Sequence, residues 1–160
     1  MKIDKSEIHT LILDQLNSDL TSIVQAVAIA RDTATHADCL GSSKYETMGL
    51  EASYLAQGQG RRLIEIERSL DYFKRLKLTQ PSALIELSSL VELLDEEGES
   101  QLLWLATEAG GLKVHYQDNT ITVITPKSPL GRAMIGKAEG DGFEIIIAGK
   151  IRSYEVSALY

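Results

Sequence analysis

Apolar residues recur along the first half of the chain with the spacing of an α-helical coiled coil. Asp4 and Glu7 form the kind of capping pair that begins a helix. After them, the steps between apolar positions alternate between three and four residues, which is the repeat of a coiled-coil seam. The series runs Leu13, Leu16, Leu20, Ile23, Val27, Ala30 and Ala34. We therefore expect one long helix over this segment.

A second series of seam positions with the same rhythm follows a short break. It runs Tyr45, Gly49, Ala52, Ala56, Gln59, Leu63, Ile66, Leu70 and Phe73. When the chain is folded back near residue 40, large residues meet large residues at the base and small residues meet small residues near the turn. The pattern predicts an antiparallel coiled-coil hairpin over residues 1–78, with a tapered tip near residues 35–44. The same seam could pair between chains, so a self-associating coiled-coil scaffold is the alternative.

The second half of the chain has the signals of a sheet. The segment Thr79-Gln80-Pro81-Ser82 interrupts the helical rhythm and predicts a linker over residues 79–82. Beyond it, short β-type runs are separated by turn signals such as Gly110-Gly111 and Asp118-Asn119. The runs are Leu87–Leu94, Leu102–Thr107, Leu112–Tyr116, Thr120–Thr125, Phe143–Ala148 and Ile151–Val156. We expect an antiparallel sheet within a domain of residues 83–160.

One short helix interrupts these strands. Ser128 has the chemistry of an N-cap, Pro129 suits the first helical position, and Gly136 suits the position just past the end. Strands, one short helix and a closing hairpin make an α+β fold, preceded here by the helical hairpin.

Charge is unevenly distributed along the chain. The net charge is −7; residues 1–78 hold ten Lys/Arg and eleven Asp/Glu, while residues 79–160 hold six and twelve. Proteins that bind duplex nucleic acid directly usually cluster Lys and Arg, because the phosphates dominate their affinity. The composition therefore argues against that class. Lys127, Arg132 and Lys137 nevertheless form a local basic patch on the acidic half.

The candidate chemistry of single residues is sparse. Cys39 is the only cysteine, so no intramolecular disulfide can form. No apolar run approaches the roughly 18 residues of a membrane span, and a cytoplasmic protein is the simplest interpretation. His36, Asp38 and Cys39 lie close together near the expected tip, but three ligands are too few for a closed tetrahedral metal site. We expect a solvated loop there.

The segment SPLGRAMIGK, residues 128–137, carries the most specific motif in the chain. With Ile124-Thr125-Pro126-Lys127 before it and Glu139-Gly140-Asp141 after it, it resembles the C-terminal signature of the GreA/GreB transcript-cleavage factors. Lys44-Tyr45-Glu46 and the segment LEASYLA, residues 50–56, resemble the region after the hairpin tip in this family. The resemblance covers nearly the whole chain, and it implies a coiled-coil hairpin followed by an FKBP-like domain.

The resemblance also implies a partner, bacterial RNA polymerase. Family members dock the globular domain at the mouth of the enzyme's secondary channel and pass the hairpin down it toward the active centre. In the family the loop at Ser128 and Pro129 contacts the polymerase, and the basic residues Arg132 and Lys137 are further contact candidates. Such a protein is not itself an enzyme. We expect a monomer that touches the nucleic acid of the elongation complex only indirectly.

In the cleaving members two acidic tip residues help to hold a second Mg²⁺ in the polymerase active site, where two metals support hydrolysis of the transcript. Counted back from Tyr45, the tip aspartate corresponds to Asp38, and Gly41 occupies the position of the second acid. We expect no tightly bound cofactor, only Mg²⁺ shared transiently with the polymerase. Either Asp38, with Glu46 or a water, still supports cleavage, or the protein modulates transcription without cleaving.

Overall fold

A computed structural model of the chain describes the backbone of residues 2–35 and 43–160 and the side chains of residues 2–32 and 57–160. The chain forms two compact units: one is Asp14–Asp71, and the other combines Met1–Leu13 with Tyr72–Tyr160. Both ends of the helical half therefore belong to the same unit as the β-rich half. The domain boundary expected at residues 79–82 stays a prediction.

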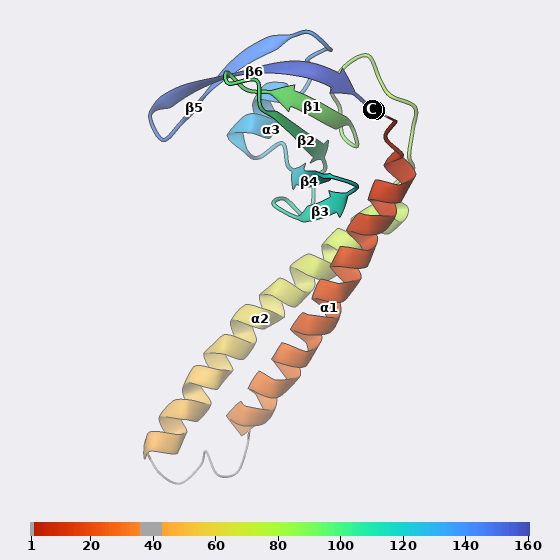
Figure 1. Ribbon diagram of the computed structural model, residues 1–160. Helices are drawn as coiled ribbons and strands as arrows, with labels where there is room; N and C mark the ends of the chain where they lie inside the picture. Colours follow the sequence, from red (N-terminus) through yellow and green to blue (C-terminus); the bar gives the residue numbers. More distant parts are fainter. Residues whose placement is uncertain (1, 36–42) are drawn as a thin grey trace. The chain divides into compact units, whose positions relative to one another are not determined.

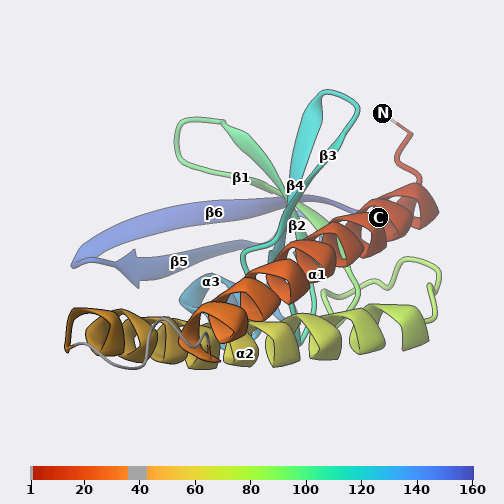
Figure 2. The same ribbon diagram turned by 90° about the horizontal axis from the view of Figure 1, so that it is seen from below.

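Two long helices make up the first half of the chain. α1 (Lys5–Thr35) and α2 (Ser43–Arg75) lie side by side and run in opposite directions (Figures 1 and 2). α1 begins where the sequence indicates, because the Asp4 carboxylate accepts hydrogen bonds from the backbone N–H groups of Ser6 and Glu7, at 2.9 and 3.3 Å. The predicted antiparallel helical hairpin is confirmed.

Within the unit Asp14–Asp71, the buried apolar side chains fall on the predicted seam. They are Leu16, Val27, Ala30, Ile66 and Leu70. Because seam positions recur every three or four residues, one stripe of each helix is buried while the residues between stay exposed. The seam positions nearest the tip, Ala34 and those from Tyr45 to Ala56, lie outside the described side chains.

The first turns of α1 bury a different stripe. Ile8 and Ile12 are completely buried, whereas Leu13, the first predicted seam residue, is only partly buried. These turns belong to the unit that contains the sheet, and the ring of His9 lies 6.4 Å from the ring of Trp104. The seam therefore begins at Leu16, because the start of α1 packs against residues of the sheet unit.

The second half contains a six-stranded sheet and one short helix. The strands are β1 (Leu90–Leu94), β2 (Ser100–Leu105), β3 (Lys113–Tyr116), β4 (Asn119–Ile124), β5 (Gly142–Ile147) and β6 (Lys150–Leu159), and α3 (Pro129–Met134) stands between β4 and β5. Their order in the sheet is β3-β4-β2-β1-β6-β5. The α+β class is confirmed.

β1 starts at Leu90 and not at Leu87, because Ser88 has a left-handed φ of 74° that interrupts the strand.

One pairing departs from the expected antiparallel sheet. β2 and β4 run parallel, while the other neighbours are antiparallel. After β2 the chain reverses and forms β3 at the edge of the sheet, and the β3–β4 hairpin then returns β4 into the space beside β2. β4 consequently runs in the same direction as β2.

The sheet is covered on both faces. Val91 pairs with Leu103 and Leu90 pairs with Trp104, so alternate residues of the central strands point to opposite faces. One face carries a core cluster that α3 completes: Ile85, Val91, Leu93, Leu103, Leu105, Met134, Ile145, Tyr154 and Val156. The other face carries Trp104, which is fully buried near His9 and Phe73.

Among the described residues, no helix combines the length and the apolar composition of a membrane span.

The β5–β6 hairpin turns through two residues in the left-handed region, Ala148 (φ 52°) and Gly149 (φ 77°). Two left-handed residues form the turn type that matches the twist of a hairpin, and Asn-Gly is its preferred sequence. We predict that Ala148→Asn raises the free energy of unfolding by about 1 kcal/mol, because the left-handed conformation costs alanine about 1–2 kcal/mol. Urea denaturation of the full chain measures the change. Gly149→Ala is the matched control and lowers stability; an Ala148→Asn variant no more stable than wild type contradicts the prediction.

Candidate functional site

The loop before α3 is held by the hydroxyl of Ser128. Its backbone is extended (φ −75°, ψ 152°), and its Oγ accepts a hydrogen bond from the N–H of Gly131 at 3.0 Å. The same hydroxyl donates to the carbonyl of Thr125 at 2.8 Å. Pro129 follows at the first helical position, where its missing N–H costs nothing. The predicted cap is confirmed, and the Ser128 hydroxyl is committed to the loop's own backbone.

Gly131 allows this loop to close on itself. A Cβ at this position would lie 2.1 Å from the carbonyl oxygen of Thr125, a distance that no real side chain tolerates. Gly131 is also buried beside the core cluster. No local sequence signal marks Gly131, because the need for glycine comes from a backbone contact six residues away. Only glycine fits here, and this close contact adds to the two hydrogen bonds of Ser128 that hold the loop.

The structure brings three of the four predicted contact residues onto one short element. Ser128, Pro129 and Arg132 lie at the start of α3 and within it, with Pro129 and Arg132 exposed. The Arg132 guanidinium donates to the carbonyl of Lys127 at 3.0 Å, which links it to the loop. Lys137, the fourth, follows the end of α3 and is half-buried; its carbonyl accepts from the N–H of Ile85 at 2.8 Å.

A trough lies beside this element. It has a volume of about 600 Å³ and is open to solvent. One side is formed by Pro129, Arg132 and Ala133, and the other by Glu144, Ile145, Ile146 and Ile151. α3 and β5 pack next to one another in this region (Figure 1). The trough joins exposed apolar side chains to the predicted contact residues Pro129 and Arg132.

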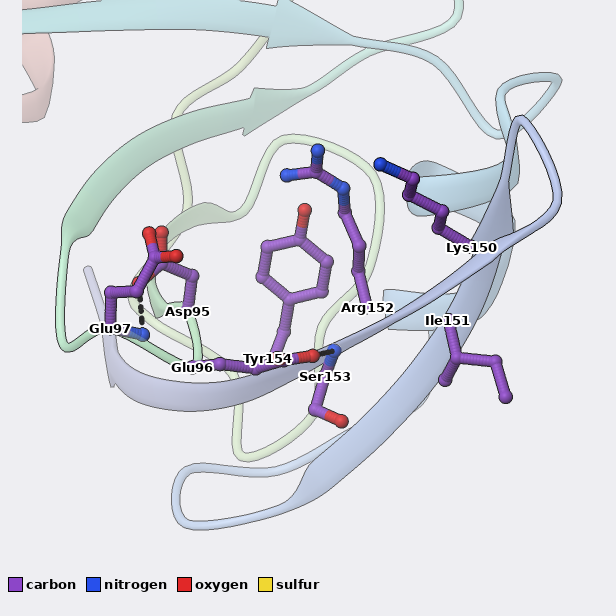
Figure 3. A pocket seen from close by; sticks show the side chains of 8 residues that line it. All are labelled: Asp95, Glu96, Glu97, Lys150, Ile151, Arg152, Ser153 and Tyr154. Atoms are coloured by element: carbon purple, nitrogen blue, oxygen red, sulfur yellow. Dashed lines mark hydrogen bonds between the residues drawn. The ribbon is translucent and has the colours of Figure 1, made fainter.

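A smaller hollow of about 190 Å³ lies at the acidic β1–β2 turn. Figure 3 shows the turn residues on one side of the Tyr154 ring and Lys150 and Arg152 on the other. The Glu96 carboxylate accepts from the N–H of Ser153 at 2.7 Å, which holds the turn against β6. Three acidic and two basic side chains line the hollow, so charges of both signs face it. We assign it a structural role.

The ends of both long helices meet the sheet around Trp104. The Nε2 of His9 donates to the carbonyl of Phe73 at 2.6 Å, and the Lys5 ammonium lies 5.3 Å from the centre of the Trp104 ring. Burial lowers the pKa of Lys5 below its usual value, and the charge of Glu86 offsets part of that shift. These contacts link residues near both ends of the helical half to the sheet, which is a structural function.

The C-terminal residue is also held in place. The N–H of Tyr160 donates to the carbonyl of Leu90 at 2.8 Å, and its phenol donates to the Glu92 carboxylate at 3.3 Å. Burial raises the pKa of Tyr160, and the charge and hydrogen bond of Glu92 raise it further. The phenol therefore remains a protonated donor at neutral pH.

The predicted tip residues lie outside the described part of the chain. This applies to Asp38 and Gly41, and also to His36 and Cys39. Their assignments stay predictions. Within the described ranges, no group of three or more His, Cys, Asp or Glu residues is placed to hold a metal ion. The Nδ1 of His115 is instead paired with the Thr120 hydroxyl at 3.1 Å.

Known proteins resemble both halves of the chain. The family model described as "Transcription elongation factor, GreA/GreB, C-term" matches residues 80–160. Transcription elongation factor GreA of Brucella canis is 30% identical over 142 residues, 89% of this chain and 83% of that protein. GreA of Ruegeria pomeroyi is 29% identical over 148 residues, 92% and 87% of the two chains. Among solved structures, the Gfh1 protein of Thermus thermophilus has a TM-score of 0.38 and 22% identity, covering 95% and 94% of the two chains.

The close approach at Gly131 leads to a stability prediction. Gly131→Ala lowers the free energy of unfolding by about 3 kcal/mol, because the added methyl group forces the Thr125 carbonyl out of place. Trp104 is the only tryptophan and reports on the sheet unit, so its fluorescence during urea titration measures the change.

Gly142→Ala is the matched control in the same unit. A Cβ there would lie 3.7 Å from the Tyr154 carbonyl oxygen, an ordinary contact, so stability changes by less than about 1 kcal/mol. Equal effects of the two substitutions would contradict the close-packing argument.

Proposed function

Because the chain belongs to the GreA/GreB family of transcription elongation factors, we propose that it acts on bacterial RNA polymerase through the secondary channel. The observation that carries the proposal is the family match over residues 80–160, which includes the SPLGRAMIGK segment. In this proposal the sheet domain docks at the channel mouth and the helical hairpin enters the channel. The polymerase performs the chemistry, and this chain is a factor and not an enzyme.

The build of the α3 loop supports a docking role. Ser128 and Gly131 fix the backbone, while Pro129 and Arg132 remain exposed. When a partner binds a loop whose backbone is already held in place, little conformational entropy of the loop is lost. The proposed polymerase contacts are therefore Pro129 and Arg132 at the centre, supported by Ser128, with Lys137 beyond the end of α3.

The length of the two helices supports the proposal that the hairpin carries its tip to a distant site on the polymerase. α1 has 31 residues and α2 has 33. At a rise of about 1.5 Å per residue, each helix spans roughly 45 Å. A pair of helices this thin cannot enclose a substrate, so its use is to deliver the residues between the two helices to a distant point. In the proposal that point is the active centre of the polymerase.

The chemistry at the tip depends on Asp38. A second Mg²⁺ in the polymerase active site, when bound, stabilises charge on the oxygens that attack and leave during transcript hydrolysis. Asp38 would contribute one carboxylate to it, since Mg²⁺ favours oxygen ligands completed by water and phosphate. Gly41 contributes none. A site with fewer anionic ligands holds the ion less firmly, which favours a weakly cleaving or non-cleaving modulator.

The first prediction of this proposal concerns binding. The full chain binds core RNA polymerase of its own bacterium, and the double variant Pro129→Ala with Arg132→Ala binds at least tenfold more weakly at an unchanged melting temperature. Competition titration with labelled wild-type protein measures the affinity. Lys113→Ala removes an exposed charge from β3 and leaves binding unchanged. Absence of wild-type binding at micromolar concentration rejects the proposal.

The second prediction concerns the tip. On stalled, backtracked elongation complexes with Mg²⁺, wild-type protein shortens the RNA slowly or not at all. Gly41→Glu restores the second acid and accelerates cleavage at least tenfold, and adding Asp38→Asn to that variant abolishes the gain. The rate of appearance of the shortened transcript measures both effects. If Asp38→Asn does not change the rate of transcript cleavage, either in the wild-type protein or in the Gly41→Glu variant, the tip acid is wrongly assigned.

The scaffold alternative has its own test. Sedimentation of the full chain gives the mass of a monomer if α1 and α2 pair within one chain, as the structure pairs them (Figure 2). A dimer that keeps its mass on dilution to micromolar concentration would favour the self-associating scaffold.

A further inference from the structure

Two glycines lie in the middle of the second long helix. Gly58 and Gly60 fall near the centre of α2, whereas none of the 31 residues of α1 is a glycine. In a helix interior, each glycine lowers the equilibrium constant for helix formation about fivefold relative to alanine, because glycine loses the most backbone freedom on folding. The two glycines therefore weaken the same turn of α2 by about 25-fold.

The fold does not require glycine at either position. Beyond the backbone of the helix itself, a Cβ at Gly58 or at Gly60 would have no described atom within 4 Å. Neither residue has a positive φ, so an ordinary side chain would fit without backbone strain. Gly131 differs, because the Thr125 carbonyl excludes a side chain there. Alanine at positions 58 and 60 would strengthen α2 without a clash, so packing does not explain the two glycines.

The residue between the two glycines weakens the same turn further. Gln59 occupies a seam position, and the antiparallel repeat places it opposite Val27, which is buried. The Oε1 atom of Gln59 is buried and has no hydrogen-bond partner among the described residues. A buried acceptor without a partner destabilises the folded form, because it has lost its hydrogen bonds to water. Opening of this turn returns the amide to water.

The facing part of α1 has little side-chain volume with which to hold the turn. Val27 has neighbours that carry only a methyl group, namely Ala26, Ala28 and Ala30. Farther from the tip, the seam holds larger buried side chains such as Leu16 and Leu70. Parts of a protein with little buried apolar surface open most readily. The hairpin is therefore held less firmly around Gln59 than around Leu70.

We propose that residues 57–60 form a hinge, a turn of α2 that opens reversibly and lets the helix bend there. Sharp bends in helices occur at glycine-containing sites and where the backbone hydrogen bonds are interrupted. The seam around Leu16 and Leu70 keeps its packing while the turn opens. Within the proposed function, the hinge lets the hairpin tip change direction in the channel while the sheet domain stays docked. The hinge itself belongs to the free chain and does not depend on that function.

Hydrogen exchange of the free full-length chain, measured by mass spectrometry, tests the opening. In the wild-type protein the amides of residues 58–64 exchange about tenfold or more faster than those of residues 66–70. The double variant Gly58→Ala with Gly60→Ala slows exchange at residues 58–64 about 25-fold, with a smaller effect on residues 66–70. Ser18→Ala is the matched control, because it places alanine at an exposed position of α1 and leaves exchange at residues 58–64 unchanged.

Trypsin gives a second measurement with an internal control. Arg61 and Arg62 directly follow the hinge, Arg68 lies farther along α2, and all three are exposed. Cleavage within a helix requires local opening, so its rate follows the population of the open form. We expect the wild-type protein to be cut after Arg61 or Arg62 before it is cut after Arg68. The double alanine variant is cut at the first two sites about tenfold more slowly or less.

Equal exchange at residues 58–64 and 66–70 in the wild-type protein overturns the hinge. Unchanged exchange and cleavage in the double alanine variant also overturn it, provided that the melting temperature shows that the variant is folded. Neither result bears on polymerase binding, so the proposed function would stand. Conversely, a chain that fails to bind polymerase but opens at residues 57–60 would reject the proposed function and keep the hinge.

Discussion

The packing of α1 and α2 against Trp104 is the constraint on which the sheet unit depends. Trp104 occupies the centre of the face opposite α3, and a single tryptophan buries one of the largest apolar areas available to any side chain. His9 and Phe73 cover its ring, and the 2.6 Å hydrogen bond from His9 to the Phe73 carbonyl ties the two helices together there. The sheet thus has a core on each face, one closed by α3 and one by the helix ends.

Local patterns predicted the elements well, and the reasons are specific. The heptad rhythm marked Leu16, Val27 and Ile66 as buried because one stripe of each helix is covered along its length. Ser128, Pro129 and Gly136 marked α3 because caps depend on residues within one turn. These signals depend on residues within one or two turns of a helix, and tertiary packing changed the predicted seam only at Leu13, in the first turns of α1.

Features set by distant contacts could not be predicted in the same way. The parallel pairing of β2 with β4 depends on which strand fills the gap beside β2, and no local pattern encodes that choice. The need for glycine at 131 comes from the Thr125 carbonyl. The exposure of Ile146 and Ile151 depends on which elements pack against the β5–β6 hairpin, and the residues of the two strands alone do not reveal it. The role of Asp38 depends on the polymerase and stays a prediction.

The position of the N-terminal residues in the fold also constrains the order of folding. The backbone N–H of Asp4 bonds the phenol of Tyr116, 112 residues away, and the Lys5 ammonium bonds the carbonyl of Tyr160, 155 residues away. Closing such long loops is slow compared with pairing neighbouring helices. During synthesis these two contacts of the N-terminal residues can form only after Tyr116 and Tyr160 have been added to the chain. A fragment that begins at residue 83 would lack His9 and Phe73 and expose the ring of Trp104 to water.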